Sequence, residues 1–79
     1  MSDIEKYVDA FKKTFMVEED QLSDLSYQGV TAWDSVGHMA LMSALEESFE
    51  IELDIDDIIE FSSFETGKAI LKKYGVTIG

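Results

Sequence analysis

Apolar residues in the first part of the chain recur at the spacing of an α-helix. They fall at i, i+3, i+4, i+7 and i+11, one stripe of an amphipathic helix, and they are Ile4, Tyr7, Val8, Phe11 and Phe15. Ser2 stands three residues before Glu5, and this pair is the signature of a capping box at a helix start. The pattern predicts a helix from about residue 3 to about residue 16.

A second helical pattern begins at Asp34 and runs to about residue 49. At about 100° per residue, one face collects His38, Leu41, Met42, Leu45 and Phe49. The opposite face collects Val36, Met39, Ala40, Ser43, Glu47 and Glu50, with Glu46 at its edge. This second face is unusual, because its first two turns are apolar although it should point to solvent if the other face is buried.

The hydrophobic pattern is less regular in residues 18–31, between the two predicted helices, and in residues 54–59, after the second one. Residues 18–31 predict a long loop with one helical turn around residues 20–25. A loop of this length in a compact domain is uncommon and often functional. Residues 54–59 predict a short helix capped by Asp54 or Asp56.

A last helix is expected over about residues 63–74. Ser62 and Glu65 form another capping box at its start, and Gly75 suits a left-handed stop. No stretch alternates with a period of two well enough to predict a paired strand. We therefore expect an all-α fold, a small four-helix bundle with three longer helices, one short third helix and a long loop between the first two, in a single domain over residues 1–79.

The charge of the chain is strongly acidic and unevenly distributed. Its 17 acidic and 6 basic residues give a formal net charge of −11. All the basic residues lie before Thr14 or after Gly67, whereas every acid except Asp3, Glu5 and Asp9 lies between them. This balance argues against nucleic acid and against anionic membranes as partners, because both bind basic surfaces. The acidic middle either keeps a small protein soluble or steers basic protein partners toward it.

The composition removes several kinds of chemistry. The chain has no Cys and a single His, which excludes disulfides, thiol nucleophiles, Cys-ligated zinc and multi-His metal sites. We expect no metal site. No apolar run approaches the roughly 20 residues of a membrane span, and the first residues lack the apolar core of a signal peptide. We therefore expect a cytoplasmic monomer.

Ser35 and His38 are the candidates for a nucleophile and its base. Three residues apart at a helix start, their side chains point about 60° apart, which does not suit a nucleophile–base pair. Trp33 occupies the position where a G-x-S-x-G elbow needs a glycine. An EF-hand over residues 54–65 fails, because Ile59 stands where a glycine is needed. We expect no catalytic residues and no enzyme activity, and we interpret His38 as a hydrogen-bonded structural histidine.

Ser35 follows Asp34 at the opening of a helix and after a long loop. The ordinary interpretation is a serine next to an N-cap. The alternative is an attachment point, because a phosphodiester on its hydroxyl would be stabilised at the positive end of the helix dipole. A pantetheine arm at this position would supply the thiol that a chain without Cys lacks.

Residues 33–51 carry a pattern that resembles the acyl carrier protein family. It comprises Trp33-Asp34-Ser35-Val36-Gly37-His38, then Leu41, Ala44-Leu45-Glu46-Glu47, Phe49 and Ile51. The family's signature is an Asp-Ser-Leu-like tripeptide that opens the second helix and a Leu-Glu-Glu-x-Phe-like stretch that ends it. The similarity extends over essentially the whole chain, including the long first loop, the short third helix and the closing helix.

The resemblance implies a prosthetic group and a set of surfaces. Ser35 would carry 4′-phosphopantetheine, transferred from coenzyme A by a phosphopantetheinyl transferase, and Asp34 would help to place the magnesium and the coenzyme A phosphates. A docking face for basic partner enzymes, such as an acyl-loading ligase or an acyltransferase, would comprise Val36, Met39, Glu46, Glu47 and Glu50. The acyl chain would be sheltered among the core residues Leu41, Leu45, Phe49, Ile58, Ile59 and Ile70.

Departures from the family's pattern bear on the cargo. Carriers of fatty-acid biosynthesis usually have acids two and five positions after the serine, where this chain has Gly37 and Ala40. The Trp33-Asp34-Ser35-x-x-His38 form resembles carriers of specialised pathways that make surface polysaccharides, secondary metabolites or modified lipids, and D-alanyl carriers also have Gly two after the serine. We therefore expect acyl or aminoacyl thioester cargo in a specialised pathway. The alternative is a non-catalytic acidic helical adaptor that binds basic proteins without a prosthetic group.

Overall fold

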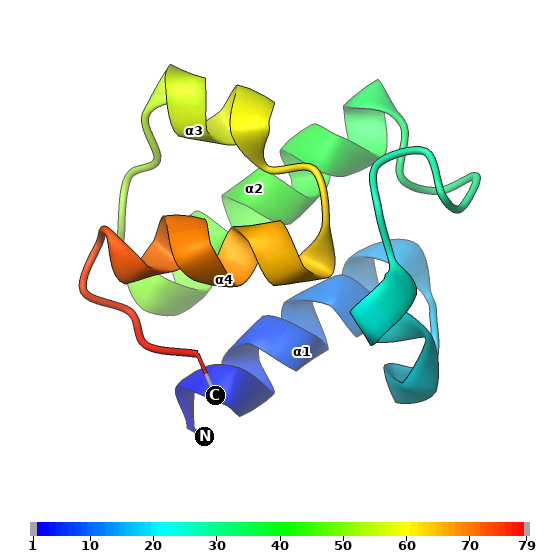
Figure 1. The fold of residues 1–79 in the computed structure, drawn as a ribbon, viewed down its shortest axis with the longest axis horizontal. Helices are drawn as coiled ribbons and strands as arrows, with labels where there is room; N and C mark the ends of the chain where they lie inside the picture. The colour runs from blue at the N-terminus through cyan, green and yellow to red at the C-terminus, as the bar shows by residue number, and fades with distance from the viewer. Residues whose placement is uncertain (1, 79) are drawn as a thin grey trace.

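A computed structural model describes residues 2–78 of the chain. Its elements in chain order are α1 (Asp3–Phe15), the 3₁₀ helix η1 (Glu19–Asp24), α2 (Ser35–Phe49), α3 (Ile55–Glu60) and α4 (Phe64–Lys72). In Figure 1, α4 runs across the middle of the molecule between α1 below and the short α3 above. The described residues form no β-strand, and the only bridge among them is an isolated one between Ser26 and Ser63. The prediction of a small all-α bundle is confirmed, and η1 corresponds to the helical turn expected inside the long loop around residues 20–25.

The ends of α1 agree with the sequence prediction. The Ser2 hydroxyl accepts a hydrogen bond from the Glu5 backbone N–H at 3.3 Å, as expected for an N-cap. Met16 ends the helix in the left-handed conformation with φ 55°, and its N–H donates to the Lys12 carbonyl. A side-chain cap and a left-handed stop therefore define this helix.

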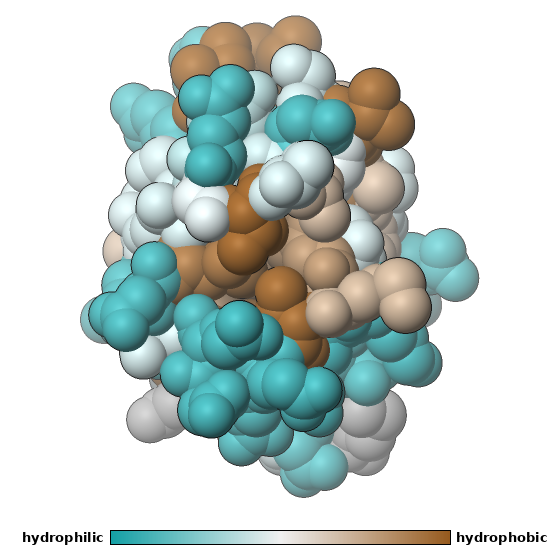
Figure 2. All heavy atoms as spheres, turned by 90° about the vertical axis from the view of Figure 1, so that its right-hand side faces the viewer, coloured by the Kyte–Doolittle hydropathy of each residue, from teal (hydrophilic) through white to brown (hydrophobic). Residues whose placement is uncertain are grey.

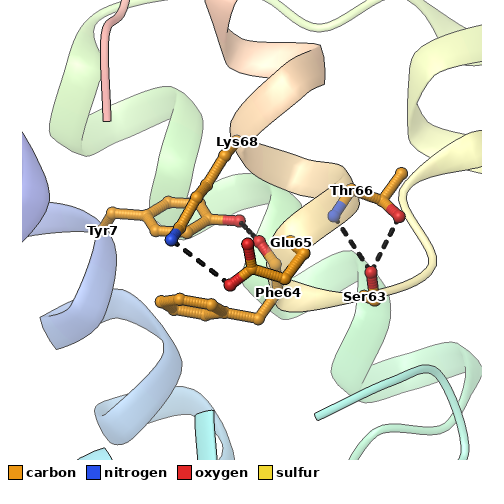
Figure 3. Close-up of polar contacts among 6 residues, drawn as sticks. All are labelled: Tyr7, Ser63, Phe64, Glu65, Thr66 and Lys68. Atoms are coloured by element: carbon orange, nitrogen blue, oxygen red, sulfur yellow. Dashed lines mark hydrogen bonds and ion pairs between the residues drawn. The ribbon is translucent and has the colours of Figure 1, made fainter. Parts of the chain in front are cut away.

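The start of α4 differs from the prediction. The N-cap is Ser63, whose hydroxyl accepts from the Thr66 N–H at 3.0 Å (Figure 3). The cap is thus not Ser62, and the expected Ser62–Glu65 capping box is not formed. The Ser62 carbonyl instead accepts from the Tyr27 N–H at 2.7 Å, which joins this connection to the long loop. A tertiary contact therefore moves the cap by one residue.

Aromatic side chains fill the core. The ring of Phe11 contacts five other aromatic rings at centroid distances of 5.0 to 6.1 Å, and they belong to Tyr7, Phe15, Trp33, Phe61 and Phe64. All six side chains are buried. The predicted stripe of α1 is thus the centre of the core, with rings from the long loop and from both sides of the α3–α4 connection around it.

The contact between α1 and α4 depends on a glycine and a phenol. The Tyr7 hydroxyl donates to the Phe64 carbonyl at 2.5 Å (Figure 3). Burial raises the pKa of the Tyr7 phenol far above its ordinary value of 10.0, and the charge of Glu65 raises it further. A Cβ at Gly67 would lie 2.2 Å from both the Tyr7 hydroxyl oxygen and the Phe61 ring. Only glycine therefore allows this approach of the two helices.

The two faces of α2 agree with the predicted pattern. Leu41, Met42 and Leu45 are buried in the core. Phe49 is only half-buried, and the Lys6 ammonium lies 5.9 Å from the centre of its ring. Every residue assigned to the outer face is exposed. None of the helices formed by residues 2–78 is long and apolar enough to cross a membrane.

Candidate functional site

Ser35 is the first residue of α2, and its side chain is exposed. The Asp34 carboxylate caps the helix by accepting from the Gly37 N–H at 2.9 Å. Trp33, directly before the cap, is fully buried and stacks on Phe15 with ring centroids 4.9 Å apart. The buried indole fixes the start of α2 against the core, while the next two side chains stay in solvent.

Gly37 explains how closely the loop approaches α2. A Cβ at this position would lie 1.9 Å from the Ala32 carbonyl oxygen and 3.2 Å from the Phe15 ring. Any larger residue would therefore displace the backbone that leads into Ser35. The glycine that departs from the pattern of fatty-acid carriers is required here by packing.

His38 uses both of its ring nitrogens in the protein interior. The Trp33 indole N–H donates to Nδ1 at 2.9 Å, and Nε2 lies 2.7 Å from the Ile58 carbonyl oxygen. Because an indole can only donate, Nδ1 accepts and Nε2 carries the proton that reaches Ile58. The interpretation of His38 as a hydrogen-bonded structural residue is confirmed. It joins the start of α2 to α3.

Tyr27 lies beside the candidate attachment point. Its phenolic oxygen is 3.4 Å from the Ser35 hydroxyl oxygen, and 37% of the residue is exposed. The sequence analysis did not identify Tyr27 as a site residue, because it stands eight positions before Ser35 in the loop. Neither helical periodicity nor a motif relates the two residues.

An apolar groove of about 600 Å³ begins at Ser35 and lies between α2 and α3. It is lined by Tyr27, Ser35, His38, Met39, Ile55, Ile58, Ile59, Phe61 and Ser62. Figure 2 views the end of the molecule where the long loop meets α2 and shows apolar surface in the middle with hydrophilic surface below it. The candidate serine thus stands at the edge of a hollow that suits a flexible apolar chain.

The predicted acyl-pocket residues divide into two groups. Ile58 and Ile59 line the groove, whereas Leu41, Leu45, Phe49 and Ile70 do not. The placement of Ile59 in the core is wrong, since 74% of this residue is exposed. The six-residue α3 buries only one side, so Ile55 and Ile59, one turn apart, both face outward at 73% and 74% exposure.

The predicted docking face is exposed except at one residue. Val36 is 79% exposed, Met39 is 51% exposed, and Glu47 and Glu50 also lie in solvent. Glu46 is half-buried, and its carboxylate accepts from the Leu53 N–H at 2.8 Å. Glu46 therefore holds the α2–α3 connection in addition to any surface role.

Asp57 is a buried carboxylate at the centre of a polar cluster that the sequence analysis missed. Its carboxylate binds the Lys73 ammonium and the Tyr74 hydroxyl, both at 2.5 Å, and Tyr74 in turn accepts from the Asp54 N–H at 2.9 Å. Hydrogen bonds from Lys73 and Tyr74 hold the pKa of Asp57 below its ordinary value of 3.8. The sequence does carry one indication of this burial. Asp57 stands four residues before the buried Phe61, and residues four apart lie on the same face of a helix.

The described residues contain no cluster of three or more His, Asp or Glu side chains that could hold a metal ion. No protein-family model matches the chain, and the comparisons with curated proteins and with solved structures also give no match. The chemistry of the site must therefore be inferred from its residues and from the resemblance carried by residues 33–51.

Proposed function

We propose that this protein is an acyl carrier protein that holds acyl or aminoacyl intermediates as thioesters on 4′-phosphopantetheine attached to Ser35. The observation that carries the proposal is the exposed Ser35 hydroxyl on the first residue of α2, at the edge of an apolar groove. The motif of residues 33–51 supports the identity of the group.

The residues around Ser35 fit such a group. The groove of about 600 Å³ has room for a flexible chain, and apolar side chains line most of it, those of Met39, Ile55, Ile58, Ile59 and Phe61. When bound, the group supplies a thiol for thioester formation, which the chain itself lacks. A carrier of this kind presents its cargo to other enzymes and catalyses nothing itself.

Loading requires an accessible serine oxygen. Ser35 Oγ attacks the β-phosphorus of coenzyme A; a new P–O bond forms, the bond to the adenosine 3′,5′-bisphosphate leaving group breaks, and the serine proton passes to a base of the transferase. Asp34 engages one carboxylate oxygen with the Gly37 N–H. The second oxygen is available to a magnesium ion brought by the transferase and coenzyme A.

The outer face of α2 is proposed as the docking surface for the loading and acceptor enzymes. Val36 and Met39 offer exposed apolar contacts, and Glu47 and Glu50 lie further along the same helix. Small apolar contacts beside acidic side chains suit brief encounters with basic enzymes, because charge attraction raises the association rate. The proposed cargo belongs to a specialised pathway, since Gly37 and Ala40 stand where fatty-acid carriers usually have acids.

The direct test is a change in mass. The purified apo chain is incubated with coenzyme A, magnesium and a broad-specificity phosphopantetheinyl transferase, and its intact mass is measured. We expect the addition of one phosphopantetheine group to the wild type and none to Ser35→Ala. Ser43→Ala removes another exposed hydroxyl from the same helix and should be modified like the wild type. An unmodified wild type, or a modified Ser35→Ala variant, would overturn the proposal.

A further inference from the structure

The phenol of Tyr27 is held in place from two sides. Its backbone N–H donates to the Ser62 carbonyl at 2.7 Å, so the loop is fixed to the α3–α4 connection. Its ring packs edge-on against His38 and Trp33, with centroid distances of 5.4 and 6.5 Å. The phenolic oxygen is thus directed at the Ser35 hydroxyl by a supported ring rather than by a free loop side chain.

The contact between Tyr27 and Ser35 is long for a hydrogen bond between two hydroxyls. The oxygens are 3.4 Å apart, whereas O–H···O bonds usually measure about 2.5–3.0 Å. A phosphate oxygen on the serine would extend outward from Oγ by one P–O bond. Such an acceptor would come within hydrogen-bond distance of the Tyr27 hydroxyl, which makes only a long contact with unmodified Ser35.

An anion at this position would meet backbone N–H groups at the start of α2, but it has no basic side chain close to it in the sequence. Residues 14–67 contain no Lys or Arg. Beyond them, Lys68 is paired with Glu65 and Lys73 with Asp57. The Gly37 N–H at the start of α2 already donates to Asp34, whose own negative charge opposes a second anion. A neutral donor beside Ser35 therefore has a larger role than it would have next to a lysine.

We propose that Tyr27 is a positioning residue for the prosthetic group: its hydroxyl donates a hydrogen bond to a phosphate oxygen of the phosphodiester on Ser35. This bond directs the first part of the arm over the groove lined by Ile55 and Ile59. No covalent bond changes in this step. The inference rests on the proposed function and adds a residue that the motif of residues 33–51 does not contain.

The test compares holo proteins after enzymatic loading. Wild type, Tyr27→Phe and Tyr7→Phe are loaded from coenzyme A, checked by intact mass, and studied by ³¹P NMR. Phe at position 27 keeps the ring that packs on His38 and Trp33 and removes only the oxygen. Tyr7→Phe is the matched control, since it removes a phenolic oxygen from the core contact with Phe64. Circular dichroism verifies that all three are folded.

We expect the same mass gain in all three proteins and a displaced phosphorus resonance only in Tyr27→Phe. Nuclear Overhauser contacts between the arm and the Ile59 methyl groups should weaken by about tenfold in this variant, the factor that corresponds to the lower end of the range for one hydrogen bond to a charged group. Equal resonances in wild type and Tyr27→Phe, or an equal displacement in Tyr7→Phe, would overturn the role of Tyr27 while the mass gain upheld the carrier function. No mass gain in the wild type would overturn both.

Discussion

The aromatic core around α1 and the region of α3 are held by different forces. Phe11 and the five aromatic side chains around it are buried and pack ring against ring. In α3 the apolar side chains of Ile55 and Ile59 are mostly exposed, and Asp57 is the buried residue of the helix. Polar contacts to His38, Lys73 and Tyr74 hold α3 in place.

This difference indicates which part of the molecule can move. Burial of apolar area resists any opening of the core, because every ring would lose its neighbours together. A helix held by a few hydrogen bonds can shift when one of them is exchanged for water. The groove beside Ser35 has α3 as one of its walls, so its width depends on the weakly held region.

The largest effect is expected from breaking the aromatic core. Phe11→Ala removes the ring that contacts five others and should lower the free energy of unfolding by about 3–5 kcal/mol. Denaturant unfolding followed by circular dichroism measures this loss. Phe49→Ala is the comparison, and it should cost less because Phe49 is half-buried. An equal loss in both variants would contradict the central position of Phe11.

A smaller effect is expected from removing the link between α2 and α3. His38→Ala leaves the Trp33 indole N–H without its acceptor and the Ile58 carbonyl without its donor. The free energy of unfolding should fall by about 1–3 kcal/mol. Amide hydrogen exchange should accelerate more in α3 than in α1. Ser43→Ala, which changes an exposed residue of α2 outside the groove, is the control. Uniform acceleration over both helices would argue against a local link.

The smallest effect is expected at Asp57 and depends on pH. The pKa of the Asp57 carboxyl is lower in the folded protein than its ordinary value of 3.8. The ionised carboxylate therefore stabilises the fold at any pH above 3.8, and this stabilisation is lost as the pH falls through the lower pKa of the folded state. Wild type should therefore be more stable than Asp57→Asn at neutral pH, and the difference should shrink in acid below about pH 3.8. Thermal unfolding across this range measures it. Asp56→Asn, at an exposed position, should show no such trend, and a pH-independent difference for Asp57→Asn would refute the explanation.

Prediction from the sequence was most accurate for helices that bury a single face against the core. The stripe of α1 and both faces of α2 follow from helical periodicity, and Ser2 and Asp34 cap the helices by side chains that reach only three residues ahead. Local rules suffice for such features, because the interacting groups are close in sequence. The exposed position of Ser35 belongs to this predictable part.

The prediction failed where distant segments decide the outcome. Ser62 does not cap α4, because its carbonyl is bonded to Tyr27 in the long loop. Ile59 is exposed although it is as apolar as its neighbour Ile58, since so short a helix packs with one side only. Tyr27 reaches Ser35 through the folding of that loop, and helical periodicity carries no information about such a contact.

The 1.9 Å approach of the Ala32 carbonyl to the place of a Cβ on Gly37 has an evolutionary consequence. A mutation that introduced a carboxylate at position 37 would have to be accompanied by a rearranged backbone over residues 31–33. Position 37 therefore stays closed to an acidic side chain for as long as the preceding loop keeps this path, and the two can change only together.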